Sequence, residues 1–188
     1  PDVNTSEFKF TVNDEGRIIY GLGAIKGVGE GPVEAITEAR LEGPFKDLFD
    51  FCARVDLKRI NKRTLDGLIR SGALDRLGPH FFDETKAYQA NIDRNRAVLL
   101  AAMEEAIKAA EQTARTHDSG HADLFGGLFV EADADVYANH RKAKELTLKE
   151  RLKGEKDTLG LYLTGHPIDE YEGEIRRFAR QRIIDLKP

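Results

Sequence analysis

The sequence predicts a mainly α-helical fold, and three observations support this. Apolar residues recur at helical spacing in several segments, one alternating segment near the start indicates a short β-hairpin, and glycine-containing turns separate the helices. The chain has 188 residues, of which 40% are hydrophobic. That length suits one domain, or two small ones, with enough chain to bury a core.

Residues 1–20 are expected to form the β-hairpin. Phe8, Phe10 and Val12 alternate with polar residues, the segment 13–16 has turn composition, and a return strand follows over 17–20. An isolated hairpin is only marginally stable in water, so we expect this one to pack on another part of the protein.

Helical spacing predicts the next elements. A helix is expected after the glycine-rich segment 21–31, a short helix over 45–52, and a third helix over 62–71 that ends at Gly72. The segment 64–74 repeats the helix-turn-helix pattern of the glycine-rich segment in weaker form. We therefore expect residues 21–80 to form a tandem unit of four helices.

A long helix is expected within residues 81–116, ending near Ala114. Its apolar residues form a narrow stripe, which predicts packing on one face over a length of about 45 Å. The stripe consists of Tyr88, Ile92, Leu99, Met103, Ile107 and Ala110.

Residues 117–138 are glycine-interrupted and acidic, which predicts an exposed, mobile loop. In residues 139–188 we expect helices again. Thr147 and Glu150 predict a capping box that starts a helix running to Thr164 and stopping at Gly165. A last short helix is expected to end near Arg180.

The glycine-rich segment has the pattern of a helix-hairpin-helix. Glycines permit the tight turn, and one valine is expected to anchor it between two helices. Backbone amides at the start of the second helix would then bind a DNA phosphate without reading a base. The candidate DNA-backbone residues are Lys26, Gly27, Val28, Gly29, Glu30 and Gly31. A tight turn that binds no ligand is the alternative, whereas a dinucleotide-binding or Walker phosphate loop lacks its required context.

The overall charge argues against a surface coated with cations for nucleic acid, because 29 basic residues face 33 acidic ones for a net charge of −4. Residues 54–76 are an exception, with seven basic and three acidic residues giving a local +4. This surplus would flank a duplex backbone, or would be an ordinary solvated helix face. The seven cations are Arg54, Lys58, Arg59, Lys62, Arg63, Arg70 and Arg76.

The acidic loop contains a pentapeptide with an adjacent Leu-Phe pair followed by two glycines. Burying such a pair inside a glycine-flanked loop is difficult, and each side chain gains roughly 1.5–3 kcal/mol on leaving water. A hydrophobic pocket on a partner is therefore expected to receive it. The pentapeptide consists of His121, Ala122, Asp123, Leu124 and Phe125. The alternative is that Leu124 and Phe125, with Leu128 and Phe129, fold back on the long helix.

No catalytic or metal-binding constellation is evident. Asp133 and Asp135 resemble a metal pair but lie in the acidic loop, and His117 and His121 would need a helix to share a face. Cys52 lies on an apolar helix face, so an inert core thiol is expected. As the only cysteine it excludes a disulfide framework and fits a reducing cytoplasm. We expect no cofactor in this chain, and no membrane partner, because no apolar run reaches about 18 residues.

Four blocks in order resemble the C-family of replicative polymerases, the α subunits of bacterial DNA polymerase III. They are residues 21–31, 43–51, 68–75 and 159–167. The resemblance covers nearly the whole chain and implies that 1–20 end the fingers, 21–80 form the tandem helix-hairpin-helix, and 139–188 lead to the next domain. Because the chain starts at Pro1 and its one methionine is Met103, we expect a piece of a longer protein.

The same resemblance implies a function. The family's sliding-clamp-binding pentapeptide has the form Gln-x-x-Leu-Phe, and residues 121–125 match it in place, with His121 instead of glutamine. Implied partners are the β sliding clamp, the backbone of double-stranded DNA and other polymerase III subunits. The chain would tether the polymerase to its clamp for processive synthesis. The magnesium-binding palm aspartates belong to another part of such a polymerase, so this chain alone is not expected to polymerise DNA.

Two other hypotheses remain open at this point. A helix-hairpin-helix accessory domain of a repair or recombination enzyme would need a catalytic Asp or Lys near the glycine-rich turn, where only Lys26 is available. A purely structural helical spacer would bind neither DNA nor clamp.

Overall fold

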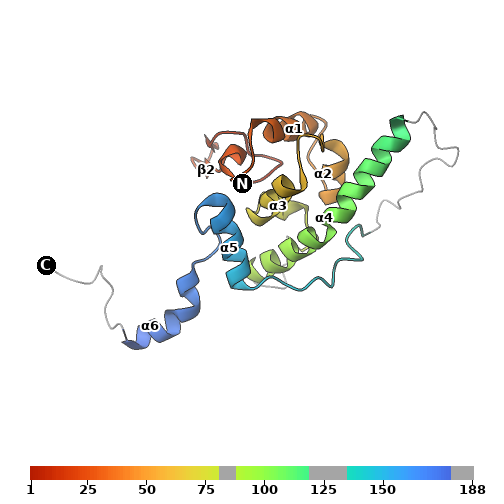
Figure 1. Cartoon of the computed structure of the whole chain (residues 1–188). Helices are drawn as coiled ribbons and strands as arrows, with labels where there is room; N and C mark the ends of the chain where they lie inside the picture. The colour runs from red at the N-terminus through yellow and green to blue at the C-terminus, as the bar shows by residue number, and fades with distance from the viewer. Residues whose placement is uncertain (81–87, 119–134, 179–188) are drawn as a thin grey trace.

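The computed structural model describes residues 1–80, 88–118 and 135–178. It is mainly helical with one small antiparallel β-hairpin, as the sequence predicts (Figure 1). The elements are β1 (Thr11–Val12), β2 (Ile18–Ile19), η1 (Leu22–Ala24), α1 (Glu30–Arg40), α2 (Leu48–Arg54), α3 (Lys62–Arg70), η2 (Asp75–Leu77), α4 (Tyr88–Asp118), α5 (Leu148–Leu159), η3 (Pro167–Tyr171) and α6 (Glu172–Phe178).

The N-terminal β-hairpin is confirmed but short. Each strand has two residues, and Thr11 pairs with Ile19. The turn is closed by Asn13, whose side-chain oxygen accepts from the Arg17 amide at 2.8 Å, and by Gly16 at φ 74°. The hairpin contacts another part of the protein, as expected. The Phe10 ring lies edge-on to Tyr20, whose hydroxyl donates to the Leu159 carbonyl of α5 at 3.3 Å.

Helices α2 and α3 begin at side-chain caps, whereas α1 begins after Gly29 without one. Asp47 accepts from the Asp50 amide at 2.8 Å to start α2, and Asn61 accepts from the Thr64 amide at 2.9 Å to start α3. The chain leaves α3 through Gly72, at φ 85°. Two of the four helices expected in residues 21–80, η1 and η2, are single 3₁₀ turns of three residues each. Glycine-containing turns on both sides keep them short.

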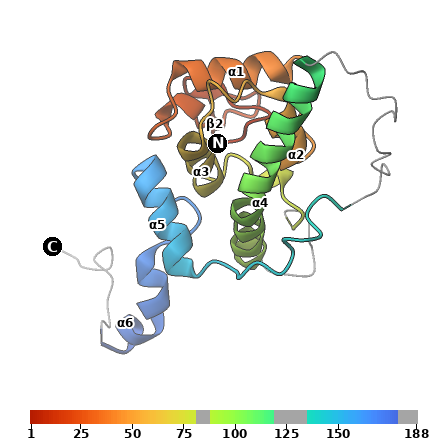
Figure 2. The same ribbon diagram turned by 45° about the vertical axis from the view of Figure 1, so that its right-hand side comes forward.

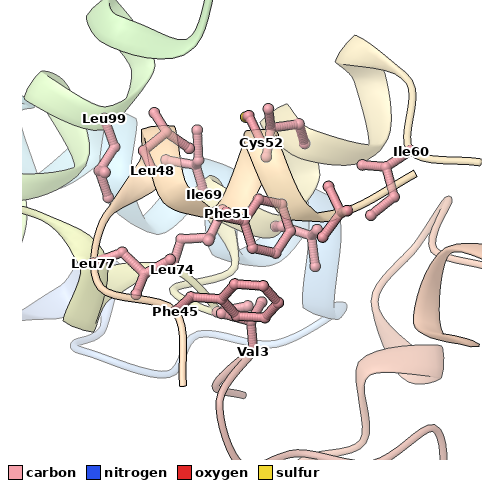
Figure 3. Packing of buried hydrophobic residues seen from close by; sticks show 14 of the residues in the cluster. Val3, Phe45, Leu48, Phe51, Cys52, Ile60, Ile69, Leu74, Leu77 and Leu99 are labelled. Carbon is pink, nitrogen blue, oxygen red and sulfur yellow. The ribbon is translucent and has the colours of Figure 1, made fainter. Parts of the chain in front are cut away.

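One hydrophobic core joins these elements. Figure 3 shows Val3 and Phe45 lying together beneath α2, and the Phe45 and Phe51 ring centroids are 4.9 Å apart. Leu48, Phe51 and Cys52 of α2 are fully or almost fully buried. The expected short helix over 45–52 therefore has the predicted apolar face, although Phe45 precedes the helix itself.

The long helix α4 is confirmed, with 31 residues, and lies across α2 (Figure 2). Its second half is buried on one face only, through Ala102, Met103 and Ala106. Its first half contradicts the predicted single face, since residues 95–99 are all buried in succession. Asn95 and Arg96 are buried there because their side chains form hydrogen bonds to other elements.

The segment after α4 also differs from the predicted loop. The helix extends to Asp118, and Tyr137, placed in the loop by the sequence, is 4% exposed. The Tyr137 hydroxyl accepts from the Leu48 amide at 2.8 Å and donates to the Leu77 carbonyl at 2.6 Å. Residues 119–134, including the pentapeptide and Asp133, lie outside the described residues.

The predicted capping box of Thr147 and Glu150 starts α5 as expected. The predicted end at Thr164 is wrong, because α5 ends at Leu159. Gly160 takes the left-handed conformation at φ 76° and its amide donates to the Lys156 carbonyl, which closes the helix one turn before Gly165. His166 caps η3, which lies against α5. Helix α6 follows to Phe178 and projects away from helices α1 to α5 (Figures 1 and 2).

Candidate nucleic-acid interface

The glycine hairpin, residues 26–31, connects η1 to α1 and packs into the protein through one side chain. Val28 is 3% exposed, which confirms its predicted anchoring role, and its amide donates to the Ile25 carbonyl at 2.9 Å. Gly27 adopts φ 86°, a conformation that side-chain-bearing residues rarely take. The turn itself therefore requires glycine at this position.

Gly29 differs from Gly27, because nothing within the described chain requires glycine at this position. Its φ is −82°, which any residue adopts, and a Cβ added there would meet no atom of the described chain within 4 Å. The space beside Gly27 is equally open, and at Gly31 only the Arg59 side chain lies at 3.9 Å. Neither backbone conformation nor internal packing requires the missing side chain of Gly29. The absence of a side chain at Gly29 leaves the backbone of the turn accessible to a ligand from solvent.

Open donors gather at this exposed backbone. Among the described residues, the amides of Gly27, Gly29, Glu30 and Gly31 have no hydrogen-bond acceptor. The last three are consecutive at the start of α1, where the helix dipole adds partial positive charge. An anion such as phosphate suits this geometry.

Two of the six candidate DNA-backbone residues cannot contribute an amide. The Lys26 amide donates to the Thr158 carbonyl of α5 at 2.8 Å, and the Val28 amide is used within the turn. Lys26 is nevertheless exposed, so its ammonium group is available. Glu30 offers its amide, while its carboxylate would repel a phosphate.

The glycine hairpin lies against α3 and α5, and the sequence did not indicate this. The Thr64 hydroxyl donates to the Gly27 carbonyl at 3.5 Å, and a Cβ on Gly67 would lie 3.8 Å from the Lys26 carbonyl. Figure 1 shows the end of α5 close to the segment that leads into α1.

The local charge surplus over residues 54–76 is mostly neutralised. Arg59 pairs with Glu34 and Glu38 of α1, and Lys62 pairs with Glu104 of α4. Arg54 pairs with Asp50 and also donates to the Ala39 and Gly43 carbonyls at the end of α1, both at 2.7 Å. Lys58 and Arg63 are exposed and form no ion pair within the described part of the chain. The positive field is therefore weaker than the count of +4 suggests.

The other predicted features can be placed only in part. The pentapeptide, residues 121–125, lies outside the described residues, and so do Leu128 and Phe129 of the fold-back alternative. The pairing of His117 with His121 falls outside them for the same reason. Burial raises the pKa of the Cys52 thiol to about 12, as suits an inert core thiol. The described segments contain no cluster of three or more metal-ligating side chains. Within those segments, no helix has the length and apolar character needed to cross a membrane.

Comparison with known proteins agrees with this geometry. Residues 1–81 match the helix-hairpin-helix motif family. The whole chain is 95% identical over 188 residues to DNA polymerase III subunit alpha of Pseudomonas fluorescens. It is thus similar throughout to a segment of that polymerase subunit. The same subunit of Pseudomonas aeruginosa is 84% identical, and that of Escherichia coli K12 is 47% identical over 192 residues.

All of this chain is aligned in each comparison. It spans only 16% of the length of the two Pseudomonas subunits and 15% of the length of the E. coli subunit. The names of these relatives support a polymerase segment with a helix-hairpin-helix and do not favour an accessory domain of a repair enzyme.

Proposed function

We propose that this chain is the duplex-DNA- and sliding-clamp-binding module of a replicative DNA polymerase α subunit, acting in the cytoplasm. One observation carries the DNA part: three consecutive open amides at the start of α1 stand beside a glycine whose missing side chain nothing in the chain requires. The similarity to DNA polymerase III subunit alpha supports replication as the DNA transaction that this contact serves.

The DNA contact is proposed to be independent of base sequence. Backbone amides bind a phosphate oxygen and carry no base information, and Lys26 adds one ammonium group. A contact with so few phosphates is weak. Its affinity falls by about 0.9 log units per phosphate for each tenfold rise in salt. Weak, sequence-neutral contact suits a module that must move along the duplex.

The second proposed contact is the pentapeptide, residues 121–125, in a pocket of the β sliding clamp. Support comes from the Leu124–Phe125 pair and from its position after the long helix. His121, in place of glutamine, offers one donor where an amide offers both a donor and an acceptor. Other polymerase III subunits are further proposed partners, which would contact other parts of the longer protein.

Joining two weak sites in one chain raises the effective concentration of the second once the first is bound. We propose that this is how the module supports processive synthesis. The catalytic step, with its magnesium ions, is proposed to take place in the rest of the longer protein and not in this chain.

Gly29→Ala tests the DNA contact. Its backbone conformation accepts alanine and its Cβ meets no neighbour, so the fold should be unchanged while phosphate approach is obstructed. We expect at least a fivefold weaker affinity for duplexes of any sequence, measured by fluorescence anisotropy at low salt. Leu41→Ala, at an exposed site just after α1, is the control. Unchanged affinity, or a loss that depends on base sequence, would contradict backbone recognition.

Leu124→Ala and Phe125→Ala test the clamp contact. Anchor residues of this kind typically cost about 2 kcal/mol or more when truncated. Binding to purified β clamp, measured by calorimetry, should therefore weaken at least 30-fold for each variant. Equal binding by the wild-type chain and the double variant would exclude the pentapeptide as the clamp contact.

A further inference from the structure

A row of three lysines follows the exposed side of α5. Lys149, Lys153 and Lys156 are spaced four and three residues apart, so they share one face over about 10 Å of helix. All three are exposed, whereas Arg151 and Glu155 on the opposite side are buried. The proposed function so far gives these lysines no role.

The lysine row forms one wall of a groove of about 360 Å³ between α5 and η3. Leu148 and Leu152 also line the groove, together with Tyr162, Pro167 and Tyr171 from the segment that follows α5. Asp157 and Glu170 are the acidic residues at its edge. The groove is therefore a cationic and apolar surface with a slight excess of positive charge.

Neighbouring groups hold two of the lysines in place. The Lys156 ammonium donates to the Gly160 carbonyl at 2.8 Å and lies 5.4 Å from the centre of the Tyr162 ring, and Lys153 pairs with Asp157. Because the Lys156 ammonium lies over Tyr162, that ring face is not free to stack on a base. These positions favour charge contacts with phosphates over base stacking.

The lysine row leads directly to the glycine hairpin. The Lys26 amide donates to the Thr158 carbonyl near the end of α5, so the two elements are joined at this point. The Lys153 ammonium, through its hydrogen bond, holds the pKa of Asp157 below its ordinary value, and the charge of Lys26 adds to this effect. Asp157 directly precedes Thr158, so the lysine row ends beside the backbone hydrogen bond that joins Lys26 to α5.

We propose that Lys149, Lys153 and Lys156 bind the phosphate backbone of double-stranded DNA and extend the contact that begins at the glycine hairpin. This inference rests on the proposed function, because the glycine hairpin supplies the first phosphate contact. A single strand is held mainly by stacking on aromatic faces, and the Tyr162 face beside the lysine row is covered by Lys156. An acidic peptide would not need continuity with the glycine hairpin. Duplex backbone explains both the charge and the location.

The test replaces all three lysines with alanine, K149A/K153A/K156A, in the chain of 188 residues. Duplex affinity is measured by fluorescence anisotropy from low to moderate salt. Each lost phosphate contact should reduce the salt dependence by about 0.9, so the slope of log affinity against log salt should fall by about 2 to 3. The triple variant K46A/K108A/K142A removes three exposed lysines from other elements and controls for the change in net charge.

Asp157→Asn provides a variant with the opposite expected effect. It removes a negative charge from the row and frees Lys153, so duplex affinity should rise about two- to fivefold. Circular dichroism would establish that all variants keep their helical content.

The outcomes separate this inference from the proposed function. Weaker duplex binding by Gly29→Ala with an unchanged salt slope in K149A/K153A/K156A would overturn the lysine row alone. A loss of equal size in the control triple variant, or one confined to single-stranded DNA, would also overturn it. If Gly29→Ala leaves duplex affinity unchanged, the proposed function fails first.

Discussion

The guanidinium of Arg96 on α4 forms a bidentate ion pair with the carboxylate of Asp75 in η2, with both N–O distances at 2.8 Å. Arg96 is 1% exposed, and its third nitrogen donates to Glu155 of α5 at 3.0 Å. Burial alone would lower the pKa of Arg96, but the two carboxylates hold it above its ordinary value. One buried arginine thus joins the helix-hairpin-helix unit to α4 and α5.

Removing Arg96 should destabilise the whole chain. Arg96→Ala leaves Asp75 and Glu155 buried without their cation, and breaking a buried pair in this way costs about 3–5 kcal/mol. The free energy of unfolding, from urea denaturation followed by circular dichroism, should fall by that amount. Arg115→Ala on the same helix, where the arginine is exposed, should change it by less than about 0.5 kcal/mol. Similar stability of the two variants would argue against the buried network.

Stability should also depend on pH through Glu155. Burial would raise the pKa of this carboxyl, but hydrogen bonds from Thr164 and Leu163 and the charge of Arg96 hold it below its ordinary value of 4.5. A lowered folded-state pKa gives stability that is present above about pH 4.5 and is lost as the pH falls through the folded-state value. Glu155 therefore contributes to stability at neutral pH and progressively less in acid.

Glu155→Gln isolates this effect. At pH 7 the variant should be less stable by about 3 kcal/mol, the lower end of the range for a broken buried pair, because Arg96 keeps Asp75. The difference from the wild-type chain should shrink as the pH falls from 5 to 3, as measured by thermal unfolding at a series of pH values. A difference that stays constant with pH would show that the carboxylate charge is not what stabilises the fold.

The phenol of Tyr137 ties the segment that precedes α5 to α2 and to the end of η2. Tyr137→Phe leaves the Leu48 amide and the Leu77 carbonyl without their buried partner, at a cost of about 2–3 kcal/mol in the free energy of unfolding. Tyr171→Phe, at a residue 55% exposed, is the matched control and should be neutral. Equal values for the two, by chemical denaturation, would mean that solvent replaces the Tyr137 bonds.

Cys52 offers a probe of global unfolding. It is 1% exposed and burial raises its pKa to about 12, so a thiol reagent should not react with it in the native state. The rate of labelling should rise with urea in parallel with the loss of helical signal. Rapid labelling in native buffer would contradict the buried position of α2.

The sequence predicted the fold well wherever the determining interaction is local. The capping box of Thr147 and Glu150 spans four residues and starts α5 as predicted. Where α5 ends was not predictable in the same way, because Gly160 and Gly165 both suit a helix stop. Only the left-handed conformation of Gly160 distinguishes them.

Long-range polar contacts were not predictable from one sequence. Arg96 stands among helix-forming residues and looks like a solvent-facing charge, and its partners Asp75 and Glu155 are 21 and 59 residues away. The same limit applies to the candidate site. Gly27 and Val28 carry a local turn signal, whereas the contact of Lys26 with Thr158 depends on how α5 packs.

The central claim is that two weak contacts in one chain act together, and binding to a β clamp that encircles duplex DNA tests it most directly. Dissociation constants would be compared for free clamp, free duplex and the clamp–duplex complex, with the wild-type chain, Gly29→Ala and Leu124→Ala/Phe125→Ala. The wild-type chain should bind the complex about 10²–10⁴ times more tightly than either partner alone, and each variant should lose this gain. Affinity for the complex no tighter than that for its better single partner would contradict the tether.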